Sequence, residues 1–137
     1  MEYQVSYEIK VEDFQKIRSN VEWNELSFRQ VEKALKHSMI NVSVFYYSEC
    51  VGIGRIVGDS VLKGMITDVM VKKEYQGKGV GKLIVTSLIS KLNEMVSVGE
   101  SFQLEASPTA SNRDFYIKCG LKYKPENQDG VYLWIRK

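Results

Sequence analysis

The chain has 137 residues, with 19 Lys and Arg against 17 Asp and Glu, a formal net charge of +2 and 44% hydrophobic residues. A chain of this length can bury roughly two thirds of its surface in one core, but it has no room for a two-half dinucleotide fold with a separate substrate domain, so we expect one domain over residues 1–137. The small net charge gives no reason to expect a nucleic-acid partner.

Cysteine usage and hydropathy narrow the class further. Cys50 and Cys119 lie far apart without a Cys-x-x-Cys motif, so we expect two reduced thiols and no metal site. The first residues mix acidic with alternating apolar positions, unlike a signal peptide, and no run approaches the roughly 20 apolar residues of a membrane span. We therefore expect a cytoplasmic protein with no membrane partner.

The first part of the chain predicts a strand followed by two helices. Apolar and polar residues alternate over residues 3–9, which is the period of a half-buried strand. Residues 13–35 show helical spacing with a break at residues 21–25, which predicts two helices separated by a short joint. Ser27 followed by Gln30 fits a capping box at the start of the second helix.

A hairpin and a central strand come next. Apolar residues over 42–46 and 51–57 flank a polar turn at residues 47–50, which predicts an antiparallel pair. Residues 62–71 predict a further strand, and its run 65–71 is apolar on both faces, which is typical of a strand buried in the middle of a sheet.

The second half predicts a strand, a glycine loop and a helix in series, and then shorter elements. A polar loop at residues 72–81 leads into a helical stripe that ends near Gly99. The remaining predicted elements are a strand at 102–106, a short helix at 112–118 closed by Gly120, and strands at 121–123 and 131–135 around a turn at 127–130. Together the elements predict one α+β domain with a mixed sheet.

The glycine loop carries the first functional signal. Three glycines alternate within residues 76–82 (QGKGVGK), so several backbone N–H groups can converge on one anion at the start of a helix. Lys78 and Lys82 would add positive charge beside the helix dipole. The loop therefore suits a pyrophosphate, although the same glycines also suit a plain strand-to-helix turn.

The spacing of the glycines separates the nucleotide-binding interpretations. A P-loop needs Ser or Thr after its Lys, but Leu83 follows Lys82. A Rossmann fingerprint needs Gly-x-Gly-x-x-Gly, whereas the spacing here is Gly-x-Gly-x-Gly past the middle of the chain. Glu105 stands where a ribose-binding carboxylate could follow, so a dinucleotide-binding module remains an alternative.

Three segments in a fixed order carry a resemblance. They are residues 68–71 (DVMV), residues 76–81 (QGKGVG) and residues 115–121 (FYIKCGL). In this order, and in the Gln-x-x-Gly-x-Gly pattern of the second segment, the sequence resembles the GNAT family of acetyl-coenzyme A-dependent N-acetyltransferases. The resemblance extends from about Val44 to Leu121.

The resemblance implies a fold and a coenzyme A site. The fold would be α+β with three α/β/α layers, a central mixed and mostly antiparallel sheet of six to seven strands, and about four flanking helices. Coenzyme A would enter where the strand ending at Val71 splays from the strand at 102–106, pairing with backbone groups there, and Gln76 would brace the loop. The expected cofactor-binding residues are Val69, Met70, Val71, Gln76, Gly77, Lys78, Gly79, Val80, Gly81 and Lys82.

The implied reaction is direct attack of a primary amine on the thioester of acetyl-coenzyme A. A backbone N–H of Val69 or Met70 is the candidate to polarise the thioester carbonyl. Tyr116 matches the tyrosine that acts as general acid in many members, because a phenol stays protonated at pH 7; core packing is the alternative role. Many members carry Asn shortly before this tyrosine, where this sequence has Pro108 and Thr109.

Two carboxylates are candidate bases. Asp68 and Glu105 lie among apolar residues on the strands that would flank the cleft, where burial makes a carboxylate a better base. The alternative for each is an ion pair, and Arg55 is a plausible partner. The amine could also bind in its neutral form and need no base.

The acceptor amine would be bound by an acid beside aromatic residues. Glu22 and Trp23 in the joint, with Tyr132 and Trp134 near the carboxyl end, would suit a cationic amine of a small molecule or a peptide. Trp23 could instead pack as a hydrophobic staple between the helices.

A homodimer is common in the family. The remaining alternative is a coenzyme A-binding regulatory protein without turnover, which Tyr116 argues against.

Overall fold

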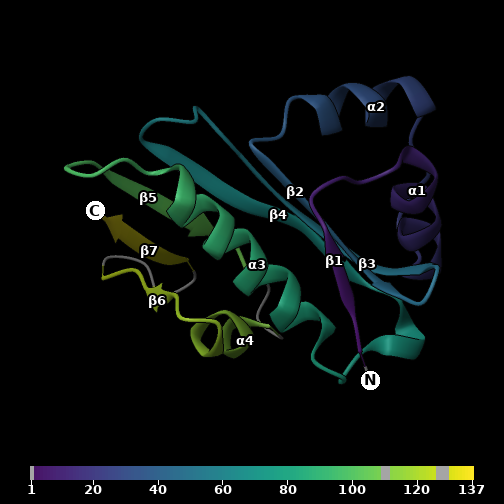
Figure 1. The fold of residues 1–137 in the computed structure, drawn as a ribbon. Coiled ribbons are helices and arrows are strands. Elements are labelled where there is room, and N and C mark those ends of the chain that lie inside the picture. The colour runs from purple at the N-terminus through teal and green to yellow at the C-terminus, as the bar shows by residue number, and fades with distance from the viewer. Residues whose placement is uncertain (1, 109–111, 126–129) are drawn as a thin grey trace.

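Seven strands form one mixed sheet in the computed structural model, which describes residues 2–108, 112–125 and 130–137 (Figure 1). The strands lie in the order β1-β2-β3-β4-β5-β7-β6. Only the β4–β5 pair is parallel, and the other five pairs are antiparallel. The strand bounds are β1 Gln4–Ser6, β2 Ile40–Tyr46, β3 Glu49–Gly58, β4 Lys63–Val71, β5 Ser101–Ala106, β6 Lys122–Tyr123 and β7 Val131–Arg136.

Helices cover both faces of this sheet. The helix bounds are α1 Val11–Asn20, α2 Phe28–Lys36, α3 Val80–Met95 and α4 Arg113–Lys118, with a short 3-10 helix η1 at Lys73–Tyr75. Figure 1 shows α3 and α4 on one side of the sheet, and α1 and α2 together on the other side. The expected three-layer α/β/α arrangement with a mostly antiparallel sheet is confirmed.

Two apolar cores bind these layers together. The α3-side core lies between α3 and the sheet, and the α1-side core lies between the first two helices and the opposite face. Main buried members of the α3-side core are Val42, Val44, Ile56, Ile66, Ile84, Leu88, Phe102 and Leu104. Buried members of the α1-side core are Ile9, Phe14, Ile17, Val31, Leu35, Cys50, Ile53 and Met70.

Most expected elements form, with shifted ends. The first strand is shorter than predicted because it pairs with β2 only over Gln4–Ser6. The hairpin turn is also tighter, since β3 already begins at Glu49. The cap on α2 is confirmed, because the Ser27 hydroxyl accepts the Gln30 N–H at 3.1 Å. β4 is the middle strand of the seven, as the apolar run predicted.

Candidate active site

The parallel pairing of β4 with β5 ends inside the sheet. Its last partners are Ile66 and Ala106. β4 continues to Val71, so within the described residues its last part, residues 67–71, has no β5 partner. The resemblance implied such a splayed edge, and we call residues 67–71 the open edge of β4.

Hydrogen bonds at the end of β4 show which backbone groups face the open edge. The Lys72 N–H donates to the Val51 carbonyl at 2.9 Å, so the backbone N–H of Lys72 points toward β3. Backbone groups alternate in direction along a strand, so those of Val71 face away from β3. There the Gln76 amide donates to the Val71 carbonyl at 3.0 Å. By the same alternation Val69 also presents its backbone to the open edge.

A β-bulge sets this direction. The register between β3 and β4 shifts by one residue between Ile53 and Arg55, so that two residues of β4, Asp68 and Val69, lie opposite Gly54. A bulge of this kind bends the strand and re-aims the groups that follow it.

The bulge reverses both the side chains and the backbone of β4. Ile66 belongs to the α3-side core and Met70 to the α1-side core, although residues an even number apart share a face in a regular strand. Before the bulge, the Leu62 carbonyl accepts the Gln103 N–H at 2.8 Å, so the backbone N–H and carbonyl groups of even-numbered β4 residues point toward β5. After the bulge, those of the odd-numbered residues point to that side, which is why the backbone of Val69 faces the open edge.

Asp68 holds the unusual backbone conformation of the bulge. Its φ is +56°, in the left-handed region that residues with a Cβ seldom adopt. Its Oδ2 lies 2.7 Å from Arg55 Nε, and both side chains are 16% exposed. Arg55 Nη1 also donates to the Ala34 carbonyl at 3.2 Å and to the Ser38 hydroxyl at 3.1 Å, beside the end of α2. The Asp68 carboxylate is therefore paired, and its role as a base stays a prediction.

The glycine loop is open and lined by backbone donors. Gly77 and Gly79 have φ values of +74° and +85°, and nothing lies within 4 Å of the position of an added Cβ at either glycine. The first bond into α3 runs from the Leu83 N–H to the Gly79 carbonyl at 3.0 Å, which leaves the N–H groups of the preceding helical turn without partners inside the helix. Such a turn binds anions.

The first turn of α3, directly after the loop, lies close to both α4 and the end of β4. A Cβ on Gly81 would lie 3.3 Å from two ring carbons of Phe115 and 3.9 Å from Val71 Cγ2. Glycine at this position therefore lets α4 approach the first turn of α3. Lys78 and Lys82 are exposed on the same loop and first turn, as a site for an anion would need.

Tyr116 is buried on α4. Only 7% of its surface is exposed, and it packs within the α3-side core. Burial raises the pKa of Tyr116 to about 12, with a smaller effect from Cys119. The phenol is thus a neutral O–H donor at ordinary pH, and the general-acid role stays a prediction. Thr109, where the sequence departs from the family pattern, lies outside the described residues.

Glu105 lines a surface pocket on the sheet face away from α3. Lys124 Nζ lies 2.6 Å from its Oε1, with the two side chains 29% and 27% exposed. A Cβ on Gly130 would lie 3.0 Å from Lys124 Cδ, so this glycine lets the lysine stem lie flat and reach Glu105. The pocket has a volume of about 340 Å³ and is lined by Gln103, Glu105, Lys124, Pro125, Tyr132 and Trp134.

This pocket brings together three of the residues predicted for acceptor chemistry. Glu105 and Tyr132 are direct cross-strand partners, and Trp134 is 43% exposed beside them. Glu22 and Trp23 do not line it. Trp23 is 51% exposed under the Arg18 guanidinium, so it is not a buried staple between the helices.

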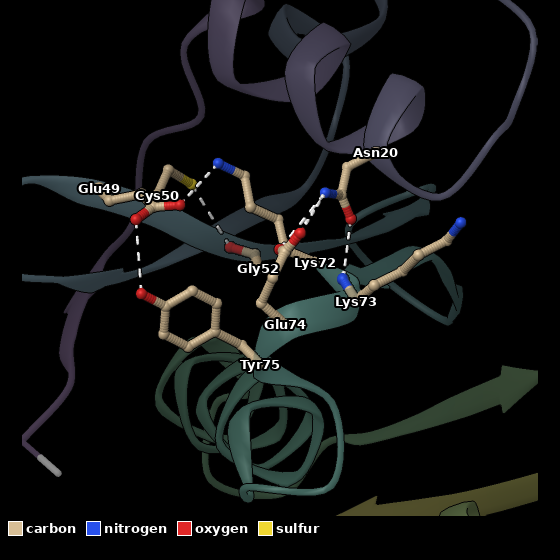
Figure 2. A network of polar contacts seen from close by, with 8 residues as sticks. All are labelled: Asn20, Glu49, Cys50, Gly52, Lys72, Lys73, Glu74 and Tyr75. Atoms are coloured by element: carbon tan, nitrogen blue, oxygen red, sulfur yellow. Dashed lines mark hydrogen bonds and ion pairs between the residues drawn. The ribbon is translucent and has the colours of Figure 1, made fainter.

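A polar network that the sequence did not predict ties α1 to the start of the glycine loop (Figure 2). The Asn20 side-chain oxygen accepts the Lys73 N–H at 2.8 Å, and its amide donates to Glu74 at 3.2 Å. Lys72 forms an ion pair with Glu49 at 2.9 Å. Lys73 and Glu74 lie 53 and 54 positions from Asn20 in the sequence, so no local pattern could reveal their contacts with Asn20.

Glu22 belongs to the edge of this network. It forms an ion pair with Lys73 at 3.1 Å and adopts a φ of +66°. The joint between α1 and α2 is thereby attached to η1, directly before the glycine loop. The network borders a pocket of about 410 Å³ lined by Asn20, Tyr46, Glu49, Lys72, Glu74, Tyr75 and Lys78.

Neither a cluster of metal-ligating side chains nor a membrane-spanning helix is present in the part of the chain that the structure describes. No group of three or more His, Cys, Asp or Glu side chains is arranged to hold a metal ion among residues 2–108, 112–125 and 130–137. Across the same ranges, no helix has both the length and the apolar character that crossing a bilayer requires.

Comparison with known proteins finds similar proteins that are named as acetyltransferases. An uncharacterized N-acetyltransferase, ycf52, from Porphyra purpurea is 27% identical over 132 residues, covering 93% of this chain and 74% of that protein. A probable acetyltransferase of unknown function from methicillin-resistant Staphylococcus aureus superposes with a TM-score of 0.76 at 23% identity, covering 92% and 95% of the two chains.

A third protein, similar in fold, has a solved structure that contains a ligand. The structure of an aminoglycoside 6′-N-acetyltransferase complexed with coenzyme A has a TM-score of 0.69 to this chain at 13% identity, covering 96% of this chain and 94% of that one. Residues 9–134 match the family described as the acetyltransferase (GNAT) domain. The match covers most of the chain and agrees with the split sheet and glycine loop described above, and the chain therefore belongs to the GNAT family.

Proposed function

We propose that the protein transfers an acetyl group from acetyl-coenzyme A to a primary amine of a small molecule or a peptide. The observation that carries this proposal is the continuity between the open edge of β4 and the glycine loop. Backbone groups of Val69 and Val71 face the edge, and the free N–H groups at the start of α3 follow a few residues later. A ligand with amides at one end and a pyrophosphate at the other matches this order.

Coenzyme A fits the residues present. Its pantetheine amides would pair with Val69 and Val71 as an added strand would, and its pyrophosphate would lie over Gly77 and Gly79, where no atom occupies the space of a side chain. Lys78 and Lys82 would add positive charge, while Met70, Gln76, Val80 and Gly81 shape the backbone. When bound, acetyl-coenzyme A supplies the thioester carbonyl, toward which the Val69 N–H is the fixed donor.

Tyr116 would assist the departing sulfur by donating a hydrogen bond. Its pKa of about 12 lies above the roughly 8.5 of an ordinary thiol, so full proton transfer would be uphill by about 5 kcal/mol. The phenol therefore donates a hydrogen bond to the developing thiolate, which takes a proton from water later. This is a weaker form of general-acid assistance than complete transfer.

The Glu105 pocket is the proposed acceptor site. A carboxylate beside Tyr132 and Trp134 attracts a cationic amine, and Glu105 lies one residue before the point where β5 leaves β4. Both carboxylates are ion-paired, Glu105 with Lys124 and Asp68 with Arg55. Glu105 is the proposed base because it lines the pocket, whereas Asp68 lies against Arg55 at the end of α2. Glu22 and Trp23 do not line this pocket, so the role in acceptor binding that the sequence predicts for them stays a prediction.

Thermal unfolding with ligands tests the proposal. Acetyl-coenzyme A at 100 times its dissociation constant should stabilise the chain by about 2.7 kcal/mol, which corresponds to a rise in Tm of roughly 5–10 °C for a domain of this size. Coenzyme A should act similarly, and NAD and ATP should not. Stabilisation by NAD alone would support a dinucleotide-binding module, and stabilisation by coenzyme A without acetyl transfer to any amine would support a regulatory protein.

A matched pair of glycine variants locates the binding. Gly79→Val and Gly99→Val place the same β-branched residue at φ values of +85° and +87°, both in open space. Both should lower the Tm, because such residues are strained there. Only Gly79→Val should lose the stabilisation by coenzyme A, and equal stabilisation of both variants would contradict the loop assignment.

A further inference from the structure

We infer that Arg55 and Asp68 are positioning residues for acetyl transfer, because their ion pair maintains the β4 bulge that turns the Val69 N–H to the open edge. The inference rests on the proposed function and assigns these two side chains a structural task within it. Neither side chain needs to touch the substrate in this role.

The first step of the argument is the backbone of Asp68. A residue with a Cβ at a φ of +56° is conformationally costly, and Asp tolerates the left-handed region better than most. A β-branched residue would favour the extended conformation instead. The bulge therefore depends on which residue occupies position 68 and on what holds it there.

The second step is how firmly Asp68 is held. Arg55 lies on the neighbouring strand and contacts Asp68 at 2.7 Å, while its Nη1 is fixed by Ala34 and Ser38. Both charged side chains are 16% exposed. The guanidinium thus connects the end of α2 to the bulge, and it orients the carboxylate from the α1-side face.

The third step is what the bulge does to the open edge. Without the extra residue, the alternation that begins at Leu62 would continue, and the Val69 N–H would face β3 instead of the open edge. A donor that points into the sheet cannot polarise a thioester bound beside β4. The conformation of Asp68 is therefore linked to the direction of the Val69 donor.

This role differs from that of a general base in a way that can be measured. As a base, Asp68 would need its carboxylate, so Gly and Val at position 68 would be equally inactive. As a positioning residue it needs its backbone conformation, which Gly adopts freely and Val resists. The comparison of Asp68→Gly with Asp68→Val separates the two roles.

The control is a second residue with a left-handed backbone. Ser60 has a φ of +68° and is exposed in the turn between β3 and β4, at the opposite end of β4 from the open edge. Ser60→Val imposes the same kind of backbone cost as Asp68→Val. It should lower the Tm without changing the site.

Three measurements are made on each full-length variant. They are the affinity for coenzyme A, the rate of thiol release from acetyl-coenzyme A with spermidine and other primary amines, and the infrared carbonyl band of bound acetyl-coenzyme A labelled with ¹³C at the thioester carbon. The labelled band reports the hydrogen bond to the carbonyl directly and requires no acceptor.

The expected result is a loss of both carbonyl polarisation and cofactor binding. Asp68→Val and Arg55→Met should lower kcat at least tenfold and, at saturating acetyl-coenzyme A, shift the labelled band to higher frequency. They should also weaken coenzyme A binding, because the bulge turns the backbone of Val71 as well as that of Val69 to the open edge. Asp68→Gly should recover most of what Asp68→Val loses. Adding Arg55→Met to Asp68→Gly should cost less than twofold, because Arg55 acts through the conformation of residue 68.

Other outcomes overturn the inference. An unshifted band in Asp68→Val, or a band shift of equal size in Ser60→Val, would show that the bulge does not aim the donor. Equal loss in Asp68→Gly and Asp68→Val, with loss of the acidic limb of the pH–rate profile in both, would make Asp68 a base. Failure of the unmodified protein to bind acetyl-coenzyme A would instead remove the proposed function, and this inference with it.

Discussion

Replacing Tyr116 with Phe tests the proposed assistance to the departing sulfur. The change removes one O–H and keeps the ring of a residue that is only 7% exposed and packs in the α3-side core. Because the packing is retained, the free energy of unfolding should change by no more than about 1 kcal/mol, or roughly 2–4 °C in Tm. The affinity for coenzyme A should also be unchanged.

The kinetic effect of removing the hydroxyl should be large and should not depend on pH between 7 and 10. A hydrogen bond to a charged group contributes about 1.5–3 kcal/mol, so kcat should fall roughly 10- to 150-fold. Burial raises the pKa of Tyr116 to about 12, and the donor therefore stays protonated well beyond pH 10. The ratio of kcat between the unmodified protein and Tyr116→Phe should thus be constant from about pH 7 to 10.

The assay is steady-state thiol release at several pH values, with Tyr123→Phe as the matched control. Tyr123 on β6 donates its O–H to Asp114 of α4 at 2.8 Å. Tyr123 is not one of the proposed site residues, so its variant loses an O–H outside the proposed site. A ratio below twofold for Tyr116→Phe would refute the donor role and leave core packing as its function. A ratio that collapses near pH 10 would refute the argument from burial.

Three further predictions concern stability. Burial raises the pKa of the Cys50 thiol from 9.0 to about 11. Because the folded state retains this proton longer than the unfolded state, stability is full below pH 9 and declines by roughly 1–2 kcal/mol up to pH 11. Cys50→Ala should remove this pH dependence from urea unfolding curves. Gly54→Ala would place a Cβ 2.5 Å from Ile84 Cγ2 and should lower stability by about 1–3 kcal/mol, which calorimetry would show as a Tm lower by roughly 3–10 °C; an unchanged Tm would mean that α3 can move away freely. Asn20→Ala removes the acceptor of the Lys73 N–H at 2.8 Å and should speed hydrogen exchange of that amide about 2- to 10-fold, since a net hydrogen bond contributes about 0.5–1.5 kcal/mol.

The parts of the fold that the sequence predicted are those with local causes. The apolar run that became β4 and the glycines before α3 have their structural reasons within a few residues of themselves. The Ser27 cap is likewise a contact between residues three positions apart. Patterns of this range can be read from the chain directly.

The parts that escaped prediction depend on distant partners. Lys124 meets Glu105 only because β6 and β7 fold back beside β5. Trp23 was expected either to bind the acceptor or to pack between helices, and the fold leaves it half exposed under Arg18. No spacing rule connects such residues, since their proximity results from the sheet order and not from their neighbours in the sequence.

The bulge at Asp68 explains why one functional feature had no sequence signal while its neighbour had a strong one. Both the glycine loop and the bulge use left-handed backbone to present N–H groups, but at Gly77 and Gly79 the absence of a side chain makes the conformation inexpensive and visible in the sequence. At position 68 the left-handed conformation is adopted by an aspartate that is held by an ion pair with Arg55. Aspartate in a strand gives no sequence signal for this conformation, whereas a glycine would. The proposed site consists mainly of backbone groups, so its sequence requirements lie in the residues that hold the backbone in place. In this proposal Arg55 is part of the site for that reason, although its side chain lies on the α1-side face of the sheet.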